Sequence, residues 1–227
     1  MEGMEEEKEE KGARKLDSRK LALLGIALAV VVAAAFAGWL AWKGHKQKLD
    51  ETAIFAAVTD TTLMLRELLA KPSAAAESVP RIDAHLVKIK AASRTQLADV
   101  AEEYVLGARE IARRRGEVAG RARQAAASRE ATMAHLAAGK NRNDGWFKTA
   151  ADLKKRMERD YYELNASLKT LDTLLSGMPD TVKRAVPLFG DKLVVRAGEF
   201  NLAAQEVQED LKRVAVELER ARQLPIN

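Results

Sequence analysis

Hydrophobic side chains recur every three or four positions through most of this chain, which is the spacing of one face of an α-helix. The pattern predicts four helices after residue 43, at about 47–71, 79–138, 144–177 and 190–223. No stretch of useful length alternates apolar and polar residues as a β-strand would. The fold class we predict is therefore all-α, with an elongated antiparallel helical bundle that has coiled-coil character.

Turn signals separate the expected helices. Pro72 ends the first of them, and Ser78 is a candidate N-cap for the second. Gly139 suits the position just after a helix, and Asn143 or Asp144 suits the N-cap of the next one. Short turns fold successive helices back on one another, and we place them near residues 72–80, 139–145 and 177–190.

The last helix has the most regular pattern in the chain. Its apolar positions alternate steps of four and three, which is the 3.5-residue seam of a coiled coil. We expect this seam to be a packing surface, either within the chain or between two copies of it. Its residues are Leu193, Ala197, Phe200, Ala204, Val207, Leu211, Val214, Leu218 and Ala221.

A run of 22 residues without a charged side chain, Leu21–Trp42, precedes these helices. A hydrocarbon core of about 30 Å needs about 20 apolar residues in a helix, so the run predicts a single transmembrane helix. Residues 1–20 then form a disordered tail, because their mixed charges leave little to bury. Residues 43–227 form the extramembrane bundle, and membrane lipid is the partner expected for residues 21–42.

The distribution of positive charge predicts the orientation. Residues 1–20 carry six Lys or Arg and residues 43–62 carry three, so the positive-inside rule places the N-terminus in the cytoplasm and the bundle outside it. This location is periplasmic if the protein is bacterial. The alternative is a signal peptide, because Ala35-Phe36-Ala37 resembles a cleavage site that would release residues 1–37. The apolar run continues to Trp42, which favours an uncleaved anchor.

The amino-acid composition limits which kinds of chemical site this protein can contain. The chain has no cysteine, which excludes disulfides and thiolate sites. Its three histidines, His45, His85 and His135, are at least 40 positions apart, so no local metal-binding pair exists. No nucleophile, base and acid are arranged together in any recognisable motif. We therefore expect no enzyme activity and name no catalytic residue, cofactor or metal ligand.

The basic stretch, residues 107–142, is the main candidate for a binding site outside the core. It holds nine Lys or Arg residues against three Glu. It suits an anionic partner such as lipid headgroups, an acidic protein, a polyanionic polymer or nucleic acid, although a solvated helix face explains it equally well. The predicted orientation argues against nucleic acid. The basic residues are Arg109, Arg113, Arg114, Arg115, Arg121, Arg123, Arg129, Lys140 and Arg142.

Trp146 and Phe147 follow an expected turn directly, and they suit either packing at the end of the bundle or contact with a partner. Taken together, the sequence favours a single-pass membrane scaffold, tether or accessory subunit that acts through protein–protein interaction. An alternative is an extracytoplasmic sensor or adaptor that binds a small or polymeric anion. A second alternative, with the opposite orientation, is a domain facing the cytoplasm that binds anionic lipid or nucleic acid.

Overall fold

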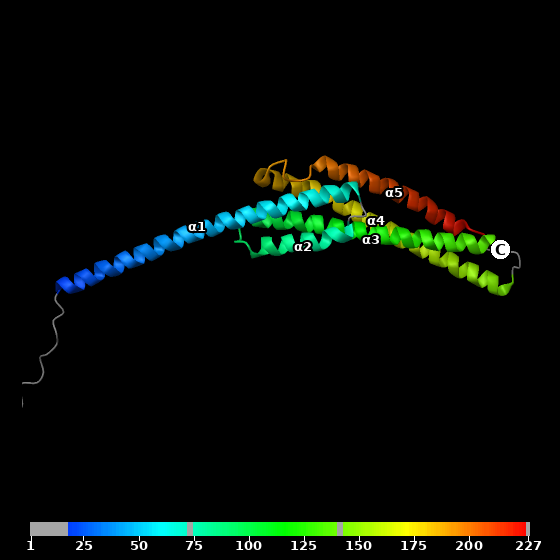
Figure 1. Ribbon diagram of the computed structural model, residues 1–227. Helices are drawn as coiled ribbons and strands as arrows, with labels where there is room; N and C mark the ends of the chain where they lie inside the picture. Colours follow the sequence, from blue (N-terminus) through cyan, green and yellow to red (C-terminus); the bar gives the residue numbers. More distant parts are fainter. Residues whose placement is uncertain (1–17, 72–74, 140–142, 226–227) are drawn as a thin grey trace, which may run out of the picture. The chain divides into compact units, whose positions relative to one another are not determined.

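Five helices make up the part of the chain that the computed structural model describes, and no strand occurs in that part (Figure 1). The backbone is described for residues 18–71, 75–139 and 143–225, and side chains are described from residue 30 onward, residue 76 excepted. This confirms the all-α prediction. The helices are α1 (Ser18–Ala70), α2 (Ala75–Ala91), α3 (Gln96–Ala137), α4 (Asp144–Phe189) and α5 (Ala197–Gln223).

The chain divides into two units, Met1–Lys48 and Leu49–Asn227, and α1 contributes residues to both. Residues 1–17 of the expected tail lie outside the described residues, and residues 18–20 belong to α1. Over the described residues, no helix is both long enough and apolar enough to cross a membrane. The side chains at positions 21–29 of the expected span lie outside that description.

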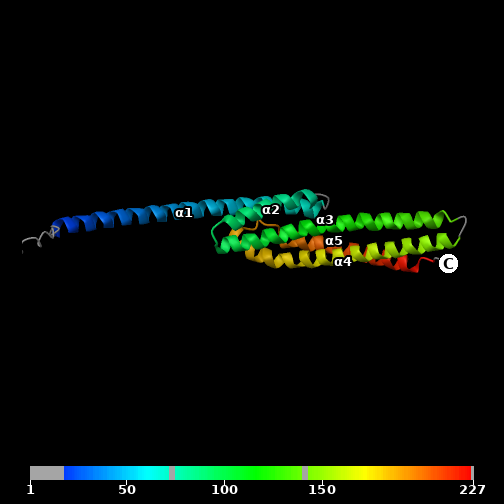
Figure 2. The same cartoon turned by 90° about the horizontal axis from the view of Figure 1, so that it is seen from below.

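The second unit is an antiparallel bundle, as the sequence predicts. α3 and α4 lie side by side along most of their lengths, and α5 returns along α4 (Figures 1 and 2). Each of α3 and α4 has more than 40 residues, or roughly 60 Å at about 1.5 Å per residue. α2 covers only the first half of α3, where Ala75 at its start approaches Gly116.

The bundle therefore has two regions. The α1–α2 region contains residues 49–116 and 168–206. The three-helix region contains residues 117–167 and 207–223, where only α3, α4 and α5 pack together (Figure 2). Residues 140–142, in the turn between α3 and α4, are not described.

The single long helix expected over 79–138 is wrong, because the chain breaks at residues 92–95. Thr95 is the N-cap of α3, and its hydroxyl accepts a hydrogen bond from the Ala98 amide at 3.2 Å. Both the amide and the hydroxyl of Ser93 donate to one carboxylate oxygen of Asp50, in α1, at 2.9 and 2.8 Å. These polar contacts hold a turn that the apolar spacing does not reveal.

Other helix boundaries also differ from the prediction. α2 begins at Ala75 rather than near residue 79, so Ser78, the candidate N-cap, lies inside the helix. α1 joins the two helices expected at residues 21–42 and 47–71 into one continuous helix, Ser18–Ala70. α4 continues to Phe189 instead of ending at residue 177, because buried Met178, Val182 and Ala185 keep its apolar face against the core past Pro179. α5 begins at Ala197 rather than at residue 190.

The segment between α4 and α5 explains this late start. Gly190 has a φ of 82°, a left-handed conformation that glycine adopts without strain. The Val195 amide donates to the Tyr104 hydroxyl at 3.1 Å, and the Thr62 hydroxyl donates to the Leu193 carbonyl at 2.9 Å. The hydroxyl oxygens of Tyr104 and Thr62 lie 2.9 Å apart. Because the Thr62 hydrogen is already donated to Leu193, the Tyr104 hydroxyl donates to Thr62 and links the two hydrogen bonds into one network. Burial raises the pKa of Tyr104, which keeps this hydroxyl protonated.

Candidate functional site

The basic stretch is largely paired with acids from within the bundle. The Arg109 guanidinium donates to Asp83 of α2, and that of Arg121 donates to Glu163 of α4. Arg129 approaches Glu217 of α5 at 3.6 Å. These contacts cross from α3 to α2, α4 and α5 at successive points along its length. The acids of the bundle therefore pair with arginines that, from the sequence alone, could have bound an external anion.

The next arginines of this stretch pair along α3 itself. Arg113 and Arg114 both donate to Glu110, at 2.6 and 2.9 Å for the nearest contacts. The hydrogen bond from Arg113 is the main cause that lowers the pKa of Glu110 to about 2. Arg114 also donates to Glu117 at 2.8 Å, whereas Arg123 donates only to the Ala119 carbonyl at 3.3 Å. Lys140 and Arg142 lie outside the described residues.

Arg115 differs from the other described basic residues of this stretch because its side chain is inside the bundle. The residue is only 5% exposed, and its Nε and one of its Nη atoms have no hydrogen-bond partner. Burial lowers the pKa of Arg115, and the negative charges of Glu206 and Asp210 on α5 act against that shift. The sequence gives no sign of this, because Arg115 ends a run of three arginines in which Arg113 and Arg114 remain partly exposed.

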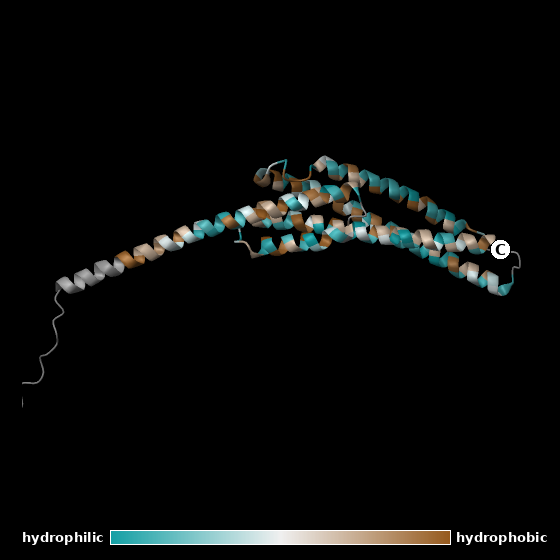
Figure 3. Cartoon of the chain, in the orientation of Figure 1, coloured by the Kyte–Doolittle hydropathy of each residue, from teal (hydrophilic) through white to brown (hydrophobic). Residues whose placement is uncertain are grey.

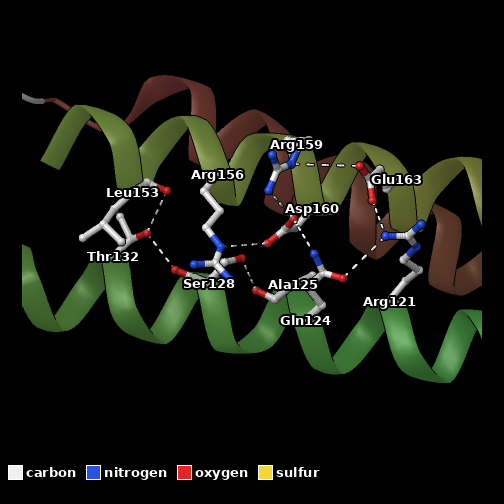
Figure 4. A network of polar contacts seen from close by, with 10 residues as sticks. All are labelled: Arg121, Gln124, Ala125, Ser128, Thr132, Leu153, Arg156, Arg159, Asp160 and Glu163. Carbon is white, nitrogen blue, oxygen red and sulfur yellow. Dashed lines mark hydrogen bonds and ion pairs between the residues drawn. The ribbon is translucent and has the colours of Figure 1, made fainter. Parts of the chain in front are cut away.

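A second buried charge lies in the three-helix region, where Figure 4 shows a polar network between α3 and α4. Asp160 is 1% exposed and accepts a hydrogen bond from the Gln124 side chain at 2.9 Å. Arg159 and Arg156 approach its carboxylate at 3.6 and 3.9 Å. Farther along, the Thr132 hydroxyl contacts the Ser128 carbonyl at 2.7 Å and the Leu153 carbonyl at 3.3 Å.

The seam of α5 is a packing surface within the chain. It packs against α4, and six of its residues are buried. Leu211 and Ala197 are half buried, and Leu193 precedes the helix. The buried residues are Phe200, Ala204, Val207, Val214, Leu218 and Ala221.

Trp146 and Phe147 pack at the end of the bundle, which favours the first of the two interpretations that the sequence allows. The Trp146 ring stacks on His135, with centroids 5.2 Å apart, and meets Phe147 edge-on at 5.1 Å. A Cβ atom on Gly139 would lie 2.9 Å from the Trp146 ring, so this turn needs glycine for close approach. Asn143 caps α4 by accepting from the Trp146 amide at 2.8 Å, which confirms the predicted N-cap.

Two exposed apolar features stand out. In the first unit, large apolar side chains between Val30 and Trp42 are between 48% and 64% exposed. Figure 3 shows brown, hydrophobic ribbon over the first described turns of this segment. In the bundle, the outer face of α2 carries a stripe at helical spacing, formed by Pro80, Ala84, Val87 and Ala91. Val87 is 68% exposed, the highest value among the exposed large apolar side chains. We call these four residues the α2 stripe; sequence analysis missed it because the inner face of α2 is also apolar.

No group of three or more potential metal-ligating side chains occurs within the described part of the chain. Comparisons with protein-family models, with curated proteins and with solved structures find no match.

Proposed function

We propose that this protein is a single-pass membrane protein whose helical bundle binds another protein, as a scaffold, tether or accessory subunit. The observation that carries the proposal is the exposed apolar segment from Val30 to Trp42. Large apolar side chains so exposed are costly in water, and lipid removes that cost. The uncharged run extends back to Leu21 in the sequence, which gives a length that suits a bilayer.

The α2 stripe supports the second half of the proposal. A helix that presents apolar side chains at steps of four, three and four on its outer face can dock against a groove or a second helix. The flanking residues Arg81 and Lys88 are exposed and would form the polar rim of such a contact. The α5 seam no longer serves as the contact surface in this proposal, because the bundle itself buries most of it.

The anchor is tested by flotation of membranes that contain the full-length protein. We expect it to float with lipid after carbonate extraction, and deletion of residues 21–42 to move it to the soluble fraction. A mature protein that begins near Gly38 and stays soluble would show that the segment is a cleaved signal peptide. A reporter fused after Asn227 tests the expected orientation, with the bundle outside the cytoplasm.

The protein contact is tested by photo-crosslinking. A benzoylphenylalanine at Val87 is expected to give a discrete cross-linked product in native membranes. The matched control is Val216 on α5, which is also an exposed valine but has charged neighbours. Equal products from both positions, or none from Val87, would contradict the α2 stripe as the contact surface.

A small anion remains the second candidate ligand, and Arg115 is the observation that favours it. A buried guanidinium with unpartnered nitrogen atoms can donate hydrogen bonds to a carboxylate or phosphate group. Thermal unfolding with and without phosphate or citrate tests this function. A rise in the melting temperature that is lost in Arg115→Met would support it over the scaffold.

A further inference from the structure

Two lysines lie over two tryptophan rings at the end of the exposed apolar segment. The Lys43 ammonium is 5.1 Å from the centroid of the Trp39 ring, and the Lys46 ammonium is 5.7 Å from that of Trp42. Phe36 extends the first pair by stacking on Trp39, with centroids 5.8 Å apart. Each Lys–Trp pair is separated by one helical turn. The helix thus carries aromatic rings and cations together at one level.

The charged side chains at this end of the apolar segment, Lys43, Lys46 and Lys48, are all positive. Between Leu21 and Leu49 the chain contains no Asp or Glu, and the first acid after it is Asp50. Asp50 accepts hydrogen bonds from Ser93 in the bundle. Lys43 therefore has no acidic residue within one helical turn on either side, and the one acid a turn away from Lys46 is Asp50, whose carboxylate already binds Ser93. An anion from outside the chain would complement them.

The apolar side chains next to them indicate what that anion belongs to. Val30, Val31 and Val32 are consecutive and are each about 60% exposed. Consecutive residues of a helix point about 100° apart, so these three face different sides. A protein partner covers one face of such a helix, whereas lipid surrounds it. The complementary anion is then the phosphate group of a lipid.

We propose that the segment Trp39–Lys46 binds anionic lipid headgroups in preference to zwitterionic ones. This inference rests on the proposed membrane anchor. Tryptophan favours the boundary between acyl chains and headgroups, and the lysine stems extend from it toward water. A ring under each ammonium holds the charge at the headgroup level while its N–H groups stay directed at phosphate oxygens. Anionic lipid adds a net charge that phosphatidylcholine lacks.

Tryptophan fluorescence tests the preference directly, because Trp146 is the only other tryptophan in the chain. Full-length protein with Trp146→Phe is reconstituted into vesicles of equal phosphatidylcholine and phosphatidylglycerol, with one lipid brominated at a time. We expect brominated phosphatidylglycerol to quench Trp39 and Trp42 about twofold more than brominated phosphatidylcholine. If that variant fails to fold, a Trp39→Phe, Trp42→Phe protein measures the Trp146 signal to be subtracted from wild type.

The lysines are tested by Lys43→Gln with Lys46→Gln, which should make the two lipids quench equally without reducing total quenching. The matched control is Lys155→Gln with Lys169→Gln on α4, which should keep the preference. Equal quenching in the protein with its lysines intact overturns this inference and leaves the anchor standing. Absence of quenching by either lipid overturns both, because the two tryptophans then lie outside the bilayer. A preference that survives the double glutamine variant overturns the role of these lysines.

Discussion

The α1–α2 region and the three-helix region are built from the same kind of helix but have different interiors. The largest fully buried side chains of the described chain, such as Leu65, Tyr104 and Ile111, all lie in the α1–α2 region. In the three-helix region, the buried positions of α3 are small or polar, namely Ala125, Ser128 and Thr132. One region is an apolar core, and the other is held by a thinner apolar strip and a polar network.

This difference has a physical cause. With α1 and α2 present, side chains on α3 are covered on several sides and can be large and apolar. Where α1 and α2 are absent, α3 meets only α4 and α5, and polar groups such as the Gln124–Asp160 pair take part in the contact between α3 and α4. Buried apolar area stabilises at about 25 cal/mol per Å², whereas buried polar pairs contribute little net free energy. We therefore expect most of the stability to reside in the α1–α2 region.

The largest expected effect is that of Tyr104→Ala. Tyr104 is fully buried, and its hydroxyl joins α1 to the segment before α5 through Thr62 and Val195. Loss of the ring leaves a cavity, so we expect the free energy of unfolding to fall by about 3–5 kcal/mol. Tyr104→Phe keeps the ring and should cost about 1–3 kcal/mol, because it leaves the Val195 amide without its acceptor. Urea unfolding of the full chain in detergent, followed by circular dichroism, measures both.

The control is Tyr162→Ala, because Tyr162 is 65% exposed. It should change stability by less than about 0.5 kcal/mol. A cost below about 1 kcal/mol for Tyr104→Ala would show that the α1–α2 region does not dominate the stability of the bundle.

The difference between the two regions can be predicted from the sequence for some helices and not for others. Periodicity alone predicts the apolar faces of α4 and α5, because leucine, valine and methionine recur there without a gap. In α3 the large apolar residues become scarce from Gly107 onward, which indicates a change of character in the second half of the helix. The apolar periodicity misses the break before α3 because polar residues mark it: Thr95 caps the helix locally, and Ser93 contacts Asp50, 43 residues away in the sequence.

The candidate site shows the same limit. Periodicity finds the α5 seam, but it cannot say whether the partner of that seam is α4 or a second chain. Local composition finds the arginines of residues 107–142, but their acids come from distant positions, such as Glu163 for Arg121. No feature of the flanking sequence distinguishes Arg115, which is buried, from Arg113, which is not. The side chain that becomes buried is decided by packing of α3 against helices elsewhere in the chain.

The second prediction concerns the polar network. Asp160→Ala should cost about 1–3 kcal/mol, because it leaves the half-buried Gln124 amide without the acceptor that Asp160 provides. Replacing both members, with Gln124→Met and Asp160→Leu, should restore stability to within about 1 kcal/mol of wild type or exceed it. Urea unfolding of the single and double variants measures this. A double variant as unstable as Asp160→Ala would show that the network stabilises the three-helix region.

The third prediction concerns Arg115, at the border of the two regions. Its guanidinium is buried without hydrogen-bond partners for two of its nitrogen atoms, so Arg115→Met should raise the free energy of unfolding by about 1–2 kcal/mol. The control is Arg113→Met at a half-exposed position, which should change it by less than about 0.5 kcal/mol. Destabilisation by Arg115→Met would show that the charges of Glu206 and Asp210 more than offset the cost of burial.

The smallest expected effect is a pH dependence within the α1–α2 region. His85 of α2 is 8% exposed, and its Nε2 lies 3.9 Å from a carboxylate oxygen of Asp60 in α1. Burial lowers the pKa of His85; Lys88 and Arg81 lower it further, and Asp60 opposes them. Folded protein then binds fewer protons than unfolded protein, so stability is complete above the unfolded pKa of 6.5 and falls as the pH drops through the folded value. One proton limits the slope to about 1.4 kcal/mol per pH unit.

His85→Gln should remove this slope. His45 and His135 are present in both proteins, so the difference in pH dependence between wild type and variant reports on His85 alone. Melting curves from pH 7.5 to 5 measure it. Asp60→Asn should steepen or extend the loss, because it removes the one charge that favours the protonated imidazole. The loss of stability should be confined to the α1–α2 region, and the three-helix region should keep its stability over the same pH range. Loss of helix in both regions together, with the same slope in His85→Gln, would show that other groups cause the acid sensitivity.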